Sequence, residues 1–373
     1  MTASFSPPQL ATLIPALAFG LGMAFGAIGQ TTRFCTMGAL ADLVTFGDAA
    51  RLRMWLTAIA VAVLATQTLI VAGTIDLSAS IYAGPRLLWA SCIIGGTLFG
   101  FGMVLASGCA SKALIRTGAG NLKALVVLII IGVVAQMTLR GVLAEGRVSV
   151  LDRWSVELAG SQDLPAWLAR VSHASVDSIR VTLALIVPTA LFAYIVRDRA
   201  FVRSRAFPGG LAIGFLVVLG WFVTAYLGYL PEHPDTLEPA WIATNSRRPE
   251  SLSFVAPLAY GLDLLTLWSD RNTTLSFGIA AAAGVIVGSL FAALLRREFR
   301  WESFGGIEDT SNHLAGAALM GFGGVTALGC TIGQGISGLS TLAAGSFLAV
   351  AGIVSGAIAA LRYQTWRVGM TKD

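Results

Sequence analysis

Residues Ala124 to Val134 read ALVVLIIIGVV, without one polar side chain. A transmembrane β-strand alternates apolar and polar residues over about 10 positions, and this run does not alternate. Apolar runs of about 18 residues or more, long enough to cross a hydrocarbon core as a helix, recur along the chain. Its residues are 55% hydrophobic and 12% charged, whereas a soluble domain carries about 25% charged residues. The sequence therefore predicts an all-α integral membrane protein.

The apolar runs divide into long and short segments. About nine are long enough to span the membrane, and we expect them near residues 10–30, 54–73, 86–106, 122–143, 179–196, 207–229, 275–295, 313–329 and 345–362. Four others are too short and are predicted to be half-helices, at about 34–46, 109–117, 252–268 and 331–342. Broken segments of this kind usually mark the transport path, because irregular backbone at membrane depth must be shielded by protein or a polar cavity.

Basic residues predict the orientation of these spans. Lysine and arginine follow every odd-numbered span, as Arg51, Arg53, Lys112, Arg116, Lys123, Arg197, Arg199, Arg203, Arg205, Arg296, Arg297, Arg300, Arg362, Arg367 and Lys372. Cytoplasmic loops carry such an excess, so we expect a periplasmic N-terminus and a cytoplasmic C-terminus at a bacterial inner membrane. The same loops account for the net charge of +5 without a nucleic-acid partner.

The glycines reveal an internal repeat. The pattern Gly95, Gly100, Phe101, Gly102, Ala106, Gly108 and Cys109 recurs 221 positions later as Gly316, Gly321, Phe322, Gly323, Ala327, Gly329 and Cys330. A weaker match at nearly the same offset pairs Phe34 with Phe254 and Asp42 with Asp263. We therefore expect two inverted, pseudo-symmetric halves, residues 1–178 and 207–373, joined by a connector at 179–206, with their short segments meeting near the midplane.

Three cysteines mark equivalent places in this arrangement. Cys35, Cys109 and Cys330 each stand where a span gives way to a short segment, whereas Cys92 lies inside a span and is interpreted as a core residue. A half-helix that begins after each cysteine would direct unpaired N–H groups and a partial positive charge toward the passage, which favours an anion. A thiol is a weak donor and a soft, polarizable group. Neighbouring residues included in this candidate substrate site are Gln30, Gln334, Gly108 and Gly329.

The segments Gly329–Gly338 (GCTIGQGISG) and Ser107–Cys109 resemble signatures of the YeeE/YedE sulfur-transport family, and the likeness covers nearly the whole chain. The resemblance implies an inner-membrane permease with antiparallel halves that takes up thiosulfate. It also implies that the three thiols pass the anion by successive S–H hydrogen bonds, and that a separate TusA-like cytoplasmic carrier receives the sulfur. We expect no enzyme activity and no cofactor.

Other interpretations remain open from the sequence. A membrane thiol or persulfide-transfer oxidoreductase would need an exposed thiolate and a nearby resolving partner, and no C-x-x-C pair is present. A soft-metal transporter could use three thiolates, and a transporter of selenium species is a further alternative. His173, His233 and His313 lack metal-ligand spacing, and Asp42 and Asp263 could be functional groups or helix caps.

Overall fold

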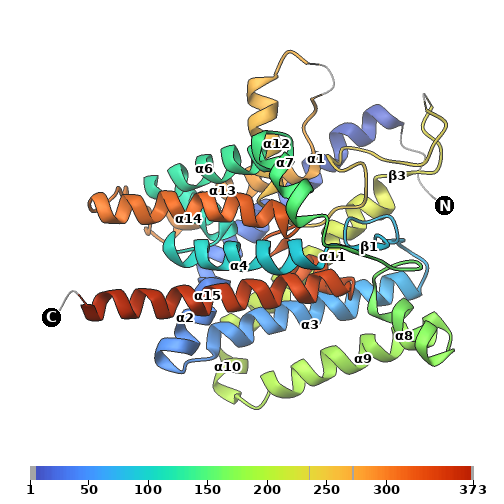
Figure 1. The fold of residues 1–373 in the computed structure, drawn as a ribbon, viewed down its shortest axis with the longest axis horizontal. Coiled ribbons are helices and arrows are strands. Elements are labelled where there is room, and N and C mark those ends of the chain that lie inside the picture. Colours follow the sequence, from blue (N-terminus) through green and yellow to red (C-terminus); the bar gives the residue numbers. More distant parts are fainter. Residues whose placement is uncertain (1–5, 235, 271–272, 371–373) are drawn as a thin grey trace.

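The computed structural model describes residues 6–234, 236–270 and 273–370, which form a bundle of long, roughly aligned helices (Figure 1). Nine long helices are present in this part of the chain: α1 (Pro7–Thr32), α3 (Ala50–Val71), α4 (Trp89–Leu105), α6 (Leu122–Leu139), α9 (Val176–Ile195), α11 (Ala206–Phe222), α13 (Phe277–Leu295), α14 (Ile307–Thr326) and α15 (Ala344–Met370). They coincide with the predicted spans to within a few residues, with three exceptions. Helix α14 begins and α15 ends further from the predicted bounds, and α11 ends at Phe222, where a π-helical segment continues to Leu227.

Shorter elements connect the long helices. They are α2 (Thr36–Phe46), α5 (Ala110–Gly118), α7 (Val142–Gly146), α8 (Leu164–Ser172), α10 (Arg199–Arg203), α12 (Ala256–Thr266) and the π-helical segments η1 (Arg147–Leu151), η2 (Val223–Leu227) and η3 (Gly333–Gly338). Two antiparallel ribbons complete the fold, one pairing β1 (Arg86–Leu87) with β2 (Val156–Glu157) and one pairing β3 (Tyr229–Leu230) with β4 (Ala240–Trp241).

The length and apolarity of the helices fit a membrane protein. Within the described residues, 8 helical segments are long and apolar enough to cross a membrane. Helix α14 is not one of them, because its first turns carry Glu308, Asp309 and His313. The chain is thus an all-α integral membrane protein in which one long helix is polar at its start.

The repeat relates α1 to α11, α3 to α13, α4 to α14 and α6 to α15. Each contact between the halves therefore occurs twice: α1 packs on α13 as α11 packs on α3, and α4 packs on α15 as α14 packs on α6. Helices α4 and α14 cross in opposite directions, because Gly95 lies against Gly323 while Gly102 lies against Gly316. These contacts are backbone to backbone, which small residues permit between spanning helices. The helical glycines that revealed the repeat are therefore contact points between its two copies.

The short segments differ in detail from their predicted bounds. Residues 252–255 lie outside the helix, and α12 begins at Ala256 with Pro257 in its first turn, where proline is tolerated because its missing N–H has no helical partner. The predicted 331–342 segment is helical only over residues 333–340, and Gly333–Gly338 within it is π-helical. Its three glycines weaken ordinary helix formation, which explains the irregular geometry.

Candidate functional site

Each of the three junction cysteines begins a short segment after a sharp backbone turn. Arg33, Ser107 and Leu328, two residues before Cys35, Cys109 and Cys330, have left-handed backbones with φ of 56°, 56° and 59°. Cys35 is the N-cap of α2 and Cys109 the N-cap of α5, while Cys330 precedes η3. One local design thus recurs three times: a long helix ends, the chain reverses its twist, and a cysteine opens the next segment.

Two of these thiols accept hydrogen bonds from the segments that they open. The Gly38 N–H donates to Cys35 Sγ at 3.3 Å, and the Gly333 N–H donates to Cys330 Sγ at 3.4 Å. Cys109 Sγ lies 3.2 Å from the Ser111 hydroxyl. Because the sulfurs of Cys35 and Cys330 act as acceptors in these contacts, their S–H hydrogens are available for another partner.

The three thiols are free and enclosed by protein. Cys35, Cys109 and Cys330 are 9%, 1% and 0% exposed. Cys109 lies within electrostatic range of both Cys35 and Cys330. The order Cys35, Cys109, Cys330 therefore runs from the partly accessible thiol to the fully enclosed one.

A cavity of about 530 Å³ opens beside Cys35. Its wall carries six basic side chains, from Arg33, Arg51, Lys112, Arg116, Arg297 and Arg300, and two acidic ones, from Glu298 and Glu302. Within the described residues, Arg33, Lys112, Arg297 and Arg300 form no ion pair. The cavity therefore has an excess of positive charge, which suits an anion.

The acidic residues of this cavity bind protein groups. Gln30 donates its amide N–H to Glu298 Oε2 at 3.1 Å, and Arg296 Nε lies 3.2 Å from the other oxygen of Glu298. Some desolvation raises the pKa of Glu298, but these hydrogen bonds and the nearby Arg33 hold it below its ordinary value. Gln30 thus joins the end of α1 to the loop after α13 and lines the cavity through its side chain.

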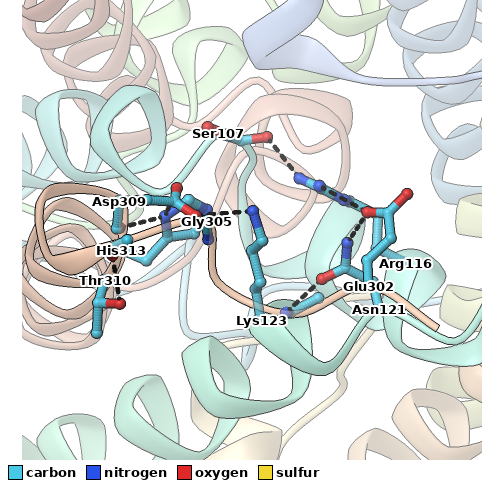
Figure 2. Close-up of polar contacts among 11 residues, drawn as sticks. Ser107, Arg116, Asn121, Lys123, Glu302, Gly305, Asp309, Thr310 and His313 are labelled. Atoms are coloured by element: carbon cyan, nitrogen blue, oxygen red, sulfur yellow. Dashed lines mark hydrogen bonds and ion pairs between the residues drawn. The ribbon is translucent and has the colours of Figure 1, made fainter.

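A polar network fixes one rim of the cavity (Figure 2). Arg116 donates to the Ser107 carbonyl at 3.3 Å and lies 3.8 Å from Glu302, which also accepts a hydrogen bond from the Asn121 amide. Next to it, Lys123 Nζ lies 2.7 Å from Asp309 Oδ2. These contacts join the α5–α6 turn to the segment before α14, so they tie the two copies of the repeat together at this rim.

A much smaller cavity, of about 10 Å³, borders Tyr82, Arg86, Gln334 and Ser346, which is room for about one water molecule. Gln334 is 1% exposed, and its amide N–H donates to the Ala327 carbonyl at 2.5 Å. The space beside Gln334 is therefore far narrower than the basic cavity beside Cys35.

The predicted glycines shape the turns before the thiols. The N–H groups of Gly108 and Gly329 donate to the carbonyls of Met103 and Gly324, both at 2.8 Å. A Cβ at Gly329 would lie 3.1 Å from the backbone nitrogen of Gln334. These glycines therefore shape the backbone turns, and their N–H groups are bonded to protein carbonyls.

Other residues singled out from the sequence lie apart from the thiols. Asp42 pairs with Arg51 at 2.9 Å, and Asp263 lies 3.6 Å from Arg140 and accepts a hydrogen bond from Gln136. Cys92 packs against Ala327 and Ala349. In the part of the chain that the structure describes, no three His, Cys, Asp or Glu side chains are grouped as metal ligands would be.

Sequence reasoning missed the cavity itself. Its basic residues come from α5, from the start of α3 and from the loops after α1 and α13. The sequence left Lys112 and Arg116 open between the positive-inside bias and attraction of an anion, and it did not group them with the other basic residues. A hint was available, since Lys112 and Arg116 follow Cys109 by three and seven positions. The sequence does not show, however, that the arginines after α13 face the same space.

A helical bundle with interrupted spans and a basic cavity beside buried thiols defines a multi-pass membrane protein of the transporter class. Comparison with protein families gives the particular family: the sulphur transport model matches residues 31–359. The chain belongs to this sulfur-transport (YeeE/YedE) family, as the resemblance predicted.

Two relatives match over most of their length. The thiosulfate transporter TsuA of Escherichia coli is 26% identical over 328 residues, covering 84% of each protein. The thiosulfate transporter TsuA of Spirochaeta thermophila is 25% identical over 346 residues, covering 88% of this chain and 92% of the relative. A shorter match, 31% over 108 residues, links 28% of the chain to the probable transporter YedE of Salmonella typhimurium. All three are named as transporters, which agrees with the prediction that the chain is not an enzyme.

Proposed function

We propose that this protein takes up thiosulfate, or a closely related small sulfur-containing anion, through a passage lined by Cys35, Cys109 and Cys330. The observation that carries the proposal is one arrangement: three buried thiols stand at the starts of short segments, and the first of them, Cys35, lines a cavity with an excess of positive charge. Both full-length relatives are named thiosulfate transporters. The soft sulfur of such an anion suits polarizable S–H groups, which hold it weakly enough to release it.

The basic cavity is assigned to the cytoplasmic side. It lies at the ends of α1, α5 and α13, where the basic loops occur, and cytoplasmic loops of inner-membrane proteins carry this excess. The basic cavity then opens to the cytoplasm. The N-terminus is periplasmic and the C-terminus cytoplasmic in this assignment.

A separate TusA-like sulfur carrier is the proposed cytoplasmic partner. A carrier whose cysteine thiolate takes the outer sulfur of thiosulfate as a persulfide, with the S–S bond of thiosulfate broken and sulfite released, would draw uptake inward. The structure supports this step only through the position of the opening next to Cys35, the most exposed of the three thiols.

Uptake of ³⁵S-labelled thiosulfate by cells that lack their own thiosulfate carriers tests the function. We expect saturable uptake when the protein is expressed, weaker competition by sulfate and sulfite, and no requirement for added metal. Uptake of selenite in preference to thiosulfate would identify a selenium transporter instead. Accumulation of Cu(I) or Zn²⁺ without thiosulfate uptake would contradict the proposal in favour of a soft-metal transporter.

A further inference from the structure

A sulfur-terminated oxyanion presents a soft sulfur atom and hard oxygen atoms, and the thiols suit only the sulfur. This inference rests on the proposed function and concerns the oxygens of the anion. Oxygens carrying negative charge are hard acceptors and prefer O–H or N–H donors. The hydroxyls of Thr36 and Thr331 follow directly after Cys35 and Cys330 in the chain.

Both hydroxyls are buried without a hydrogen-bond partner. Thr36 and Thr331 are each 1% exposed, and within the described residues neither Oγ1 atom has a partner. A buried hydroxyl left unpaired destabilises the protein, so such groups usually have a ligand or solvent role. Thr66 on α3 shares this property, but it is not adjacent to a cysteine.

Other buried threonines bond to a carbonyl of their own helix. Thr57, Thr138 and Thr326 each donate to the carbonyl four residues earlier, at 2.7 Å. Thr36 has no such carbonyl in its own helix, because it is the first residue of α2, and Thr331 precedes η3. Their positions at the start of a segment leave the hydroxyls free for another acceptor.

The repeat indicates that the fold itself does not need these hydroxyls. Thr331 corresponds to Ala110 at the offset of the cysteine repeat, and Thr36 corresponds to Ala256 at the offset that aligns α2 with α12. Alanine therefore serves at the equivalent position in each case. The middle thiol, Cys109, has its own hydroxyl neighbour in Ser111, with Sγ and Oγ 3.2 Å apart.

We propose that Thr36 and Thr331 donate hydrogen bonds to the oxygens of the transported anion while the adjacent thiols contact its sulfur. Each pair of consecutive residues, Cys35–Thr36 and Cys330–Thr331, then offers one soft donor and one hard donor. An anion with both sulfur and oxygen at its surface satisfies both donors at once, and an anion with oxygen alone satisfies only the hydroxyl. The pairing is a specificity device for thiosulfate-like anions.

The test replaces each hydroxyl by a methyl group in the purified full-length protein. For Thr36→Val and Thr331→Val we expect the apparent affinity for thiosulfate to fall about 10-fold, the usual effect of losing a hydrogen bond to a charged group. Affinity is measured from uptake into proteoliposomes and from the rise in melting temperature on adding thiosulfate. The melting temperature without thiosulfate should stay the same or rise, since an unpaired hydroxyl has been removed.

Two controls make the result decisive. Thr36→Ser and Thr331→Ser keep the hydroxyl and should keep most of the affinity for thiosulfate. Thr66→Val removes an unpaired hydroxyl elsewhere and should leave the affinity for thiosulfate unchanged. Wild-type affinity in both valine variants would overturn the inference while leaving the proposed function intact. Failure of the wild-type protein to bind or transport thiosulfate would instead overturn the proposed function.

Discussion

Left-handed backbone at Arg33, Ser107 and Leu328 is the residue-level feature that positions the thiols. A side chain at positive φ is strained, because its Cβ approaches the following carbonyl oxygen. Three such residues at one distance before three cysteines show that the turn, rather than the residue type, is what the site requires. Glycine would adopt this conformation without strain, yet it occupies none of the three positions.

Replacement of Ser107 tests this account of the turn. We expect Ser107→Gly to raise the free energy of unfolding by about 1 kcal/mol, because strain at φ 56° is relieved. Ser107→Val should lower the melting temperature, since a β-branched side chain fits this conformation poorly. Thermal unfolding of the purified protein in detergent measures both, and equal melting temperatures for the two variants would contradict the account.

Sequence reasoning at the residue scale located the thiols but did not show the partners of their neighbours. Cys35, Cys109 and Cys330 were found from their repeated positions, and the structure places each at the start of a short segment. The amides of Gln30 and Gln334 were candidate substrate donors, and both donate to protein acceptors. Such partners come from segments far away in the chain, so no local pattern could reveal them.

At the scale of elements, helices α1 and α13 are held together by backbone contact at glycines. A Cβ at Gly26 would lie 2.1 Å from the carbonyl oxygen of Val285, and a Cβ at Gly288 would lie 2.0 Å from that of Met23. Without a hydrophobic driving force between helices in lipid, such close packing supplies much of their association. The spacing of these two helices therefore depends on the absence of side chains.

A matched pair of substitutions on α1 tests this packing. We expect Gly26→Ala to lower the melting temperature, because α1 and α13 must move apart to admit the methyl group. Gly20→Ala lies on the same helix with nothing within 4 Å of the added Cβ, and it should be neutral or slightly stabilising. Thermal unfolding distinguishes the two, and a neutral Gly26→Ala would show that this contact is not tight.

The long elements could be predicted from the sequence, and the broken ones only in part. Runs such as Ala124–Val134 have no alternative to a spanning helix, so α6 was found with little error. The segment after Cys330 was expected to be a half-helix through residue 342, but it is helical only over residues 333–340 and mostly π-helical. Its course depends on tertiary contacts, such as the bond of 2.8 Å from the Ser337 hydroxyl to the Leu252 carbonyl, which no local pattern encodes.

For the whole molecule, the inverted repeat explains why α1 begins and α15 ends at opposite ends of the bundle (Figure 1). The pairing of repeat copies follows from glycines that can be read in the sequence. The basic cavity does not, because it forms only when the ends of α1, α5 and α13 meet. The sequence thus predicted the symmetry, and the structure added the shape of the opening.

Cysteine accessibility tests the proposed orientation of the whole molecule. In a variant that keeps Cys35 and replaces the other cysteines by alanine, a membrane-impermeant thiol reagent should label Cys35 in inside-out vesicles but not in intact spheroplasts. The expectation follows because Cys35 lines the basic cavity assigned to the cytoplasm. Labelling only from the periplasmic side would reverse the assignment.

Thiosulfate uptake by cysteine variants tests the central claim most directly. In proteoliposomes, we expect Cys35→Ala, Cys109→Ala and Cys330→Ala each to reduce uptake of labelled thiosulfate by about 10-fold or more, with serine at the same positions keeping part of it. Cys92→Ala, which removes a thiol packed between helices, should transport at the wild-type rate. Normal thiosulfate uptake after replacement of all three junction cysteines by alanine would contradict the account.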